Sequence, residues 1–128
     1  MRWGKSFVAA LALAGLFLLP PCGEASGLDD VLAKAKQEGK VVMLELGSVG
    51  CIPCEQMKPV MAKLTNSYKA KLEVIFVDVR FDRRAAQRFM VYMIPTQVFL
   101  DKTGKEFYRH IGYYSYEEIV PVLKKAGI

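Results

Sequence analysis

Hydrophobic residues follow two spacings from residue 26 onward. In some segments they recur every three or four positions, as on one face of a helix. Elsewhere they form short runs rich in β-branched residues, which are typical of buried strands. The predicted helices begin near Leu28, Cys51, Asp82 and Ser115, and the predicted strands cover 41–46, 72–79, 97–100 and 105–111. The resulting order of elements is α-β-α-β-α-β-β-α.

This order predicts an α/β fold with a central four-stranded mixed sheet flanked by helices on both faces. Strands that alternate with helices pair in parallel, whereas the last two strands are joined by the turn at 101–104 and form an antiparallel hairpin. No internal repeat, low-complexity tract or long linker interrupts residues 26–128. We therefore expect these residues to form a single domain.

The first 25 residues have a different pattern. A basic start is followed by an apolar run at 7–19, by two prolines and by a small-residue site at 23–25. This combination is typical of a secretory signal peptide, and the run is too short to span a bilayer as a helix. We expect residues 1–25 to be a signal peptide and the protein to be exported to the periplasm. Cys22 offers the alternative of a lipid anchor, although the prolines directly before it fit that processing badly.

Composition and charge narrow the choice of protein class. The chain is 52% hydrophobic and 24% charged, with a net charge of +5, which is ordinary for a globular protein and excludes a disordered chain or an all-helical membrane protein. The positive charge is mild, and no dense Lys/Arg tract is interleaved with aromatic residues. Nucleic acid is therefore not an expected partner.

Cys51 and Cys54 carry the most specific chemistry of the sequence. They follow a predicted buried strand and open a predicted helix, whose free N–H groups and dipole stabilise a thiolate at Cys51. Cys51 is then the attacking thiol, and the more buried Cys54 resolves the mixed disulfide. Pro53 is tolerated in the first helical turn. The alternatives are a zinc site, for which His110 is the only histidine, a static structural disulfide, and a related fold without activity.

Glu45 interrupts the otherwise apolar strand at 41–46. A carboxylate buried beneath a dithiol has a raised pKa and can relay the proton of Cys54. The alternative is a surface position on an edge strand. Ile94-Pro95-Thr96 is a further feature, because a proline just before a strand is either a cis residue or a plain strand-entry proline.

Together these residues resemble the thioredoxin family over nearly all of residues 26–128. Cys51-Ile52-Pro53-Cys54 takes the place of the Cys-Gly-Pro-Cys of the family, and Pro59 matches its kinked helix. Glu45 falls where thioredoxin has a buried aspartate. Ile94, Pro95 and Thr96 match the cis-proline loop, which by this resemblance packs against the dithiol and binds substrate backbone. Gly112, after the hairpin, also fits.

Several departures from the family pattern bear on function. Gly50 stands in the place of the tryptophan before the first cysteine, so the active-site loop consists of Gly50, Ile52 and Pro53 around the cysteines. Phe76 replaces the lysine beside the buried acid, and the first strand of thioredoxin is missing. Glutamate in place of aspartate, together with export, resembles periplasmic reductases of cytochrome c maturation and thiol-disulfide interchange domains.

The resemblance implies a thiol-disulfide oxidoreductase that reduces protein disulfides. Its partners are then protein disulfides and dithiols and a membrane electron donor of the interchange or CcdA type. We expect a monomer, no metal, and no cofactor other than the redox-active disulfide of Cys51 and Cys54. An oxidase or isomerase is the alternative within the same class, because Ile52 between the cysteines tunes the potential. A non-catalytic binding module with the same fold is the alternative outside it.

Overall fold

The computed structural model describes residues 27–128, which form the predicted sequence of eight elements. These are α1 (Leu28–Gln37), β1 (Val41–Gly47), α2 (Ile52–Tyr68), β2 (Leu72–Asp78), α3 (Arg83–Arg88), β3 (Thr96–Leu100), β4 (Glu106–Ile111) and α4 (Tyr116–Lys125). Their ends differ from the sequence prediction by one or two residues. The predicted signal peptide and Cys22 lie outside the described residues. Within residues 27–128, no helix has the length and hydrophobicity needed to cross a membrane.

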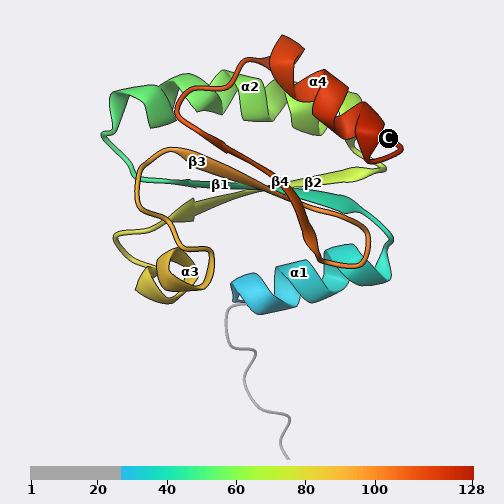
Figure 1. The fold of residues 1–128 in the computed structure, drawn as a ribbon, viewed down its shortest axis with the longest axis horizontal. Coiled ribbons are helices and arrows are strands. Elements are labelled where there is room, and N and C mark those ends of the chain that lie inside the picture. The colour runs from blue at the N-terminus through green and yellow to red at the C-terminus, as the bar shows by residue number, and fades with distance from the viewer. Residues whose placement is uncertain (1–26) are drawn as a thin grey trace, which may run out of the picture.

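The four strands form one mixed sheet in the order β2-β1-β3-β4, as predicted. β1 pairs in parallel with β2, and the pairs β1–β3 and β3–β4 are antiparallel. Helices α2 and α4 cover one face of the sheet, and α1 and α3 cover the other (Figure 1). β2 and β4 are the edge strands, so β1 lies inside the sheet.

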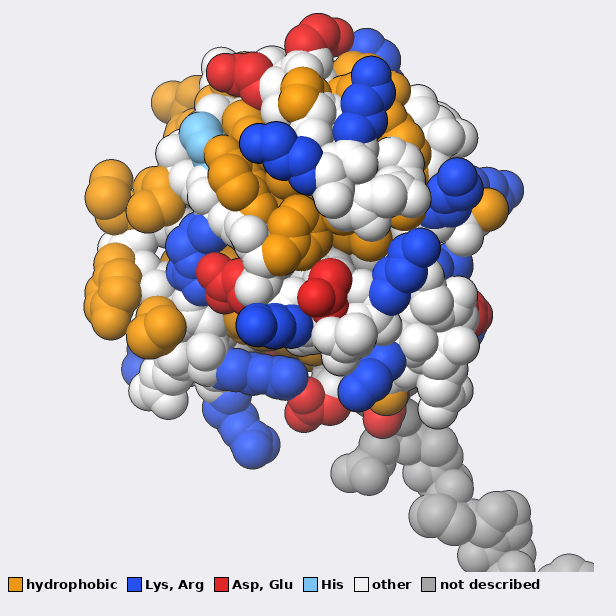
Figure 2. Space-filling view, turned by 45° about the vertical axis from the view of Figure 1, so that its right-hand side comes forward, with side chains coloured by type: hydrophobic (Ala, Val, Ile, Leu, Met, Phe, Trp, Pro, Cys, Tyr) orange, Lys and Arg blue, Asp and Glu red, His pale blue; other side chains and the backbone are white. Residues whose placement is uncertain are grey.

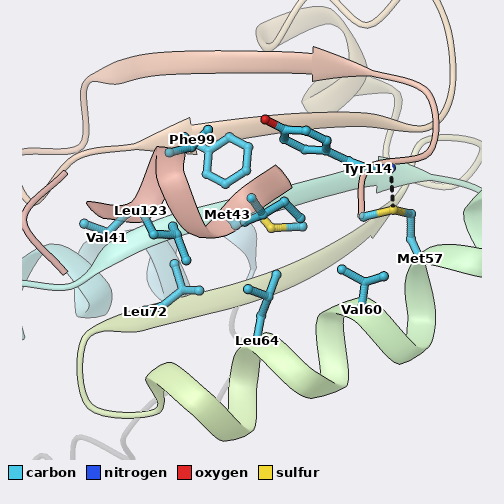
Figure 3. Close-up of a cluster of buried hydrophobic side chains, with 11 residues drawn as sticks. Val41, Met43, Met57, Val60, Leu64, Leu72, Phe99, Tyr114 and Leu123 are labelled. Atoms are coloured by element: carbon cyan, nitrogen blue, oxygen red, sulfur yellow. Dashed lines mark hydrogen bonds between the residues drawn. The ribbon is translucent and has the colours of Figure 1, made fainter. Parts of the chain in front are cut away.

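Both faces of β1 are buried, which explains its nearly continuous apolar sequence. Val41 and Met43 point into the core beneath α2 and α4, where they pack with Leu64 of α2 and Leu123 of α4 (Figure 3). Val42, Leu44 and Leu46 belong to the second core, on the other face of the sheet. Odd-numbered residues of β1 therefore face α2 and α4, and this assigns Glu45 and Gly47 to that side.

Side-chain caps stand at the starts of α3 and α4, whereas α1 begins after Gly27 without one. Asp82 caps α3 by accepting a hydrogen bond from the N–H of Ala85 at 2.8 Å. Ser115 and Glu118 form a reciprocal capping box at the start of α4. The prolines inside helices do not end them, because α2 continues past Pro59 and α4 past Pro121.

Candidate functional site

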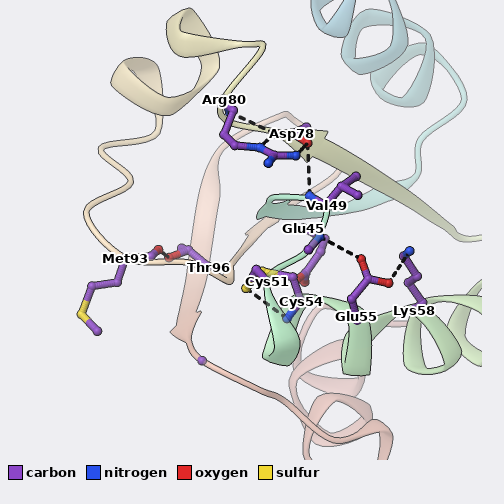
Figure 4. Close-up of a disulfide and its surroundings, with 12 residues drawn as sticks. Glu45, Val49, Cys51, Cys54, Glu55, Lys58, Asp78, Arg80, Met93 and Thr96 are labelled. Atoms are coloured by element: carbon purple, nitrogen blue, oxygen red, sulfur yellow. Dashed lines mark hydrogen bonds and ion pairs between the residues drawn. A yellow bond between two sulfur atoms is a disulfide. The ribbon is translucent and has the colours of Figure 1, made fainter.

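The two cysteines form a disulfide where β1 leads into α2, with Cα atoms 5.2 Å apart (Figure 4). Cys51 is the N-terminal capping residue of α2, and its sulfur accepts a hydrogen bond from the N–H of Cys54 at 3.4 Å. Pro53 lies in the first turn, where its missing N–H costs no intrahelical bond. Once the disulfide is reduced, the free N–H groups and the dipole of α2 favour a thiolate at Cys51.

The two cysteines differ in their access to solvent. Cys51 is half-buried, whereas Cys54 is only 2% exposed. The sulfur of Cys54 packs directly on β1, since a Cβ atom added at Gly47 would lie 3.1 Å from it. Cys51 is therefore the sulfur that a large partner can reach, and a side chain at position 47 would crowd the sulfur of Cys54.

Two carboxylates hold the loop between β1 and the disulfide. Glu55 of α2 accepts a hydrogen bond from the N–H of Gly50 at 3.3 Å, and Asp78 of β2 accepts one from the N–H of Val49 at 3.2 Å (Figure 4). The Arg80 guanidinium pairs with Asp78 at 3.0 Å, and together with the backbone N–H groups of Arg80 and Val49 it lowers the pKa of Asp78 to about 2. The loop is thus fixed by groups that stay ionised at neutral pH.

Glu45 is fully buried, as the apolar pattern around it predicts, and the alternative of a surface position on an edge strand is wrong. The strand register places it between Phe76 of β2 and Gln97 of β3, so the position inferred for Phe76 from the resemblance is correct. Burial raises the pKa of Glu45 to about 7, against the opposing effect of a hydrogen bond from Gln97. The acid is therefore poised to exchange a proton near neutral pH.

Glu45 and Cys54 lie on the same face of the sheet. Glu45 and Gly47 are alternate residues on one face of β1, which separates their Cα atoms by about 7 Å. Because Cys54 packs on Gly47, its sulfur lies on the same side of β1 as the Glu45 side chain.

The peptide bond between Ile94 and Pro95 is cis, which is the first of the two alternatives left open by the sequence. Thr96 donates a hydrogen bond from Oγ1 to the carbonyl of Met93 at 2.6 Å, and the N–H of Gly112 donates to the carbonyl of Pro95 at 2.8 Å. Thr96 pairs with Leu46, so Pro95 comes opposite Gly47 at the end of the sheet that carries the disulfide. The cis-proline turn and the dithiol thus belong to one site.

The chain is similar to known proteins. Residues 28–127 match the family of thioredoxin-like domains. The chain belongs to this family. Thioredoxin of Staphylococcus aureus is 28% identical over 91 residues, which cover 71% of this chain and 86% of that protein.

Solved thioredoxin structures have the same fold as this thioredoxin-like domain. The germline-specific thioredoxin Deadhead of Drosophila melanogaster has a TM-score of 0.68 at 21% identity, covering 81% of this chain and 98% of its own. Thioredoxin NaTrxh of Nicotiana alata has a TM-score of 0.63 at 30% identity, and the match covers 73% of this chain and 80% of that protein. With its cysteine pair at the start of α2, the thioredoxin-like domain described here is a thiol-disulfide oxidoreductase.

Large apolar side chains are exposed along the segments that flank the reactive groups of this domain. Ile52, between the cysteines, is 75% exposed, and Val49 before them is also exposed. Tyr92 and Met93, just before the cis-proline turn, are 88% and 63% exposed. Figure 2 shows hydrophobic side chains projecting from the left-hand edge of the molecule. Exposed apolar groups at a reactive site favour the docking of a protein substrate.

No cluster of three or more His, Cys, Asp or Glu side chains able to hold a metal ion occurs between residues 27 and 128. The two cysteines are bonded to each other in this form of the domain.

Three polar residues of the site were not predicted from the sequence. Asp78 and Glu55 hold the active-site loop, and Gln97 donates a hydrogen bond to Glu45 at 3.0 Å. Gln97 had a detectable signal, because it interrupts an apolar strand as Glu45 does. Asp78 and Glu55 had none, since either could equally have been a solvated carboxylate.

Proposed function

We propose that this protein is an exported reductase of protein disulfides, with Cys51 as the attacking thiol and Cys54 as the resolving thiol. The difference between the two sulfurs carries the proposal. Cys51 caps α2 and is half-buried, whereas Cys54 is nearly inaccessible on Gly47. A partner disulfide can reach only Cys51, and the helix start stabilises the thiolate there.

The reaction exchanges two electrons between sulfur atoms. The Cys51 thiolate attacks a substrate disulfide R–S–S–R′, forms a mixed disulfide with R and releases R′ as a thiolate, which takes a proton from water. The Cys54 thiolate then attacks the sulfur of Cys51 and breaks its bond to R. The protein ends as the Cys51–Cys54 disulfide, two electrons poorer, and the substrate ends as two thiols.

Glu45 is the group we propose to accept the proton of Cys54 in the second step. A thiol nearly excluded from water has no other route to a reactive thiolate than a nearby base. A pKa of about 7 lets Glu45 take the proton and then release it to the departing R thiolate or to water. The reverse sequence serves an oxidase equally well, so this role does not depend on the direction of electron flow.

Export and the electron donor belong to the same proposal. The basic, apolar and small-residue pattern at 1–25 supports a signal peptide and a periplasmic location. A reductase in an oxidising compartment needs a dedicated supply of electrons. We assign this supply to a membrane donor of the interchange or CcdA type, and the substrates to protein disulfides such as those of cytochrome c maturation. The protein acts as a monomer.

Two cysteine variants test the assigned roles. Cys54→Ser lacks the resolving thiol and is expected to accumulate mixed disulfides with protein substrates, whereas Cys51→Ser is expected to accumulate none. Non-reducing electrophoresis followed by mass spectrometry measures both. Equal accumulation by the two variants would refute the assignment of attacking and resolving roles.

The reduction potential of the cysteine pair tests the direction of electron transfer. Equilibration of the wild-type protein in dithiothreitol or glutathione buffers, followed by alkylation and mass measurement, gives the potential of the Cys51–Cys54 pair. A value near −270 mV, the approximate value of thioredoxin, supports a reductase. A value near −120 mV, about that of a strong oxidant, would reverse the direction and make the protein a disulfide donor.

A further inference from the structure

Beneath α2 and α4 the sheet carries a row of polar side chains near the disulfide. The register places Gln97 of β3 opposite Glu45 of β1, and His110 of β4 opposite Gln97. Gln97, like Glu45, is fully buried. A buried amide has a large desolvation cost unless its hydrogen bonds are made, so its partners indicate what it does.

The amide nitrogen of Gln97 makes two hydrogen bonds. It donates to Oε2 of Glu45 at 3.0 Å and to the carbonyl of Gly112 at 3.1 Å. A backbone carbonyl can only accept, so the nitrogen of the Gln97 side chain, rather than its oxygen, must face Gly112. Both hydrogens of the amide are thereby used, and its orientation is fixed independently of the charge of Glu45.

The two remaining oxygens of this pair lack partners. Oε1 of Glu45 and Oε1 of Gln97 are buried, and neither has a hydrogen-bond partner within residues 27–128. When Glu45 is ionised, both of these atoms are acceptors. A proton on Glu45 supplies a donor at this place, and only Oε1 is free to carry it, because Oε2 already accepts from Gln97.

We propose that Gln97 is a positioning residue that fixes the proton of neutral Glu45 on Oε1. By donating to Oε2 in both charge states, Gln97 leaves Oε1 as the only atom that gains or loses the proton. The inference rests on the proposed function, in which Glu45 accepts the proton of Cys54, and it adds the atom at which that proton arrives.

The same hydrogen bond also sets the pH at which Glu45 titrates. Burial raises the pKa of Glu45, and the bond from Gln97 lowers it again. Loss of the Gln97 amide should therefore raise the pKa further. Such a variant leaves the other titratable side chains around Glu45 in place. They include Asp78, Tyr108 and His110 on the same face of the sheet, and Cys54 and Tyr114 on the segments that cover it.

NMR titration of the oxidised wild-type protein tests the contact, because neither cysteine titrates in that form. The carboxyl signal of Glu45 and the side-chain amide signals of Gln97 are expected to shift with one common midpoint near pH 7. The exposed Gln87 provides the internal control, and its side-chain amide should not follow that midpoint. Gln97 signals that do not respond to the titration of Glu45 would overturn the proposal.

A variant of Gln97 then tests whether its hydrogen bond lowers the pKa of Glu45. Gln97→Met keeps the length of the side chain and removes its donor, so the Glu45 midpoint should move up by about one pH unit. Gln87→Met, the matched control, should leave it in place. The pH profile for resolution of the mixed disulfide should move with the midpoint, and Gln97→Met should not move that profile in a Glu45→Gln background.

Failure of the role proposed for Gln97 can be distinguished from failure of the role proposed for Glu45. An unmoved Glu45 midpoint in Gln97→Met overturns the role of Gln97 as a positioning residue. A midpoint that moves while the rate profile stays in place refutes instead the proposed role of Glu45 as the base for Cys54.

Discussion

Replacing Glu45 by glutamine should stabilise the oxidised protein at alkaline pH. Burial raises the pKa of this acid from 4.5 to about 7, so between these values the folded chain holds a proton that the unfolded chain has lost. Stability therefore falls as pH rises through this window and becomes constant above it. At 1.36 kcal/mol per pH unit, the ionised acid lowers the free energy of unfolding by about 3 kcal/mol at pH 8.

Glutamine has almost the shape of the neutral acid and does not titrate. The free energy of unfolding of Glu45→Gln should thus exceed that of the wild type by about 3 kcal/mol at pH 8, and its melting temperature should be higher by roughly 10 °C or more. Below pH 4.5 the stabilities of the two proteins should converge. Urea unfolding of the oxidised proteins, followed by circular dichroism at several pH values, measures this difference. Glu117→Gln is the control, since Glu117 is exposed and should change stability by only about 0.5 kcal/mol or less.

The pH dependence of this stability difference tests whether the buried Glu45 has a raised pKa. A stability difference that is the same at pH 5 and pH 8 would show that Glu45 is not desolvated in the way the structure indicates. A variant that is less stable than the wild type at pH 8 would contradict the sign of the argument.

Two further predictions concern the loop and the strand around the disulfide. Gly47→Ala places a Cβ 3.1 Å from the sulfur of Cys54 and should lower the free energy of unfolding by about 1–3 kcal/mol in urea. Gly27→Ala, with open space around it, should show no such clash and should cost only about 1 kcal/mol or less, through the N-cap position of α1. Asp78→Ala removes the acceptor of the Val49 N–H, so amide hydrogen exchange at Val49 should accelerate about tenfold; unchanged exchange would show that this bond does not hold the loop.

The fold was predictable because its elements are encoded locally. The apolar run of β1, the helical spacing in α2 and the capping box at Ser115 each identify an element without knowledge of the others. Glu45 was identifiable for the same reason, since a single carboxylate in an apolar strand is conspicuous in the sequence.

Other parts of the site depend on which strands become neighbours, and the sequence does not contain this information in local form. The role of Gln97 follows from its register with Glu45, and that of Asp78 from the distance between β2 and the loop at Val49. The state of the bond before Pro95 is likewise set by tertiary contacts, because both isomers are accessible to an X-Pro bond in isolation.

The packing of Cys54 on Gly47 divides the active site into a buried part, in which substitutions disturb the core, and an exposed part, in which they do not. Positions 47 and 54 form one inseparable unit, because the sulfur occupies the space that any side chain at position 47 would need. Ile52 is exposed to solvent, so its side chain does not constrain the residues of the core. Substitutions at position 52 can therefore change the chemistry of the cysteine pair while the core stays intact, so libraries that vary the reactivity of this protein should keep Gly47 and randomise Ile52.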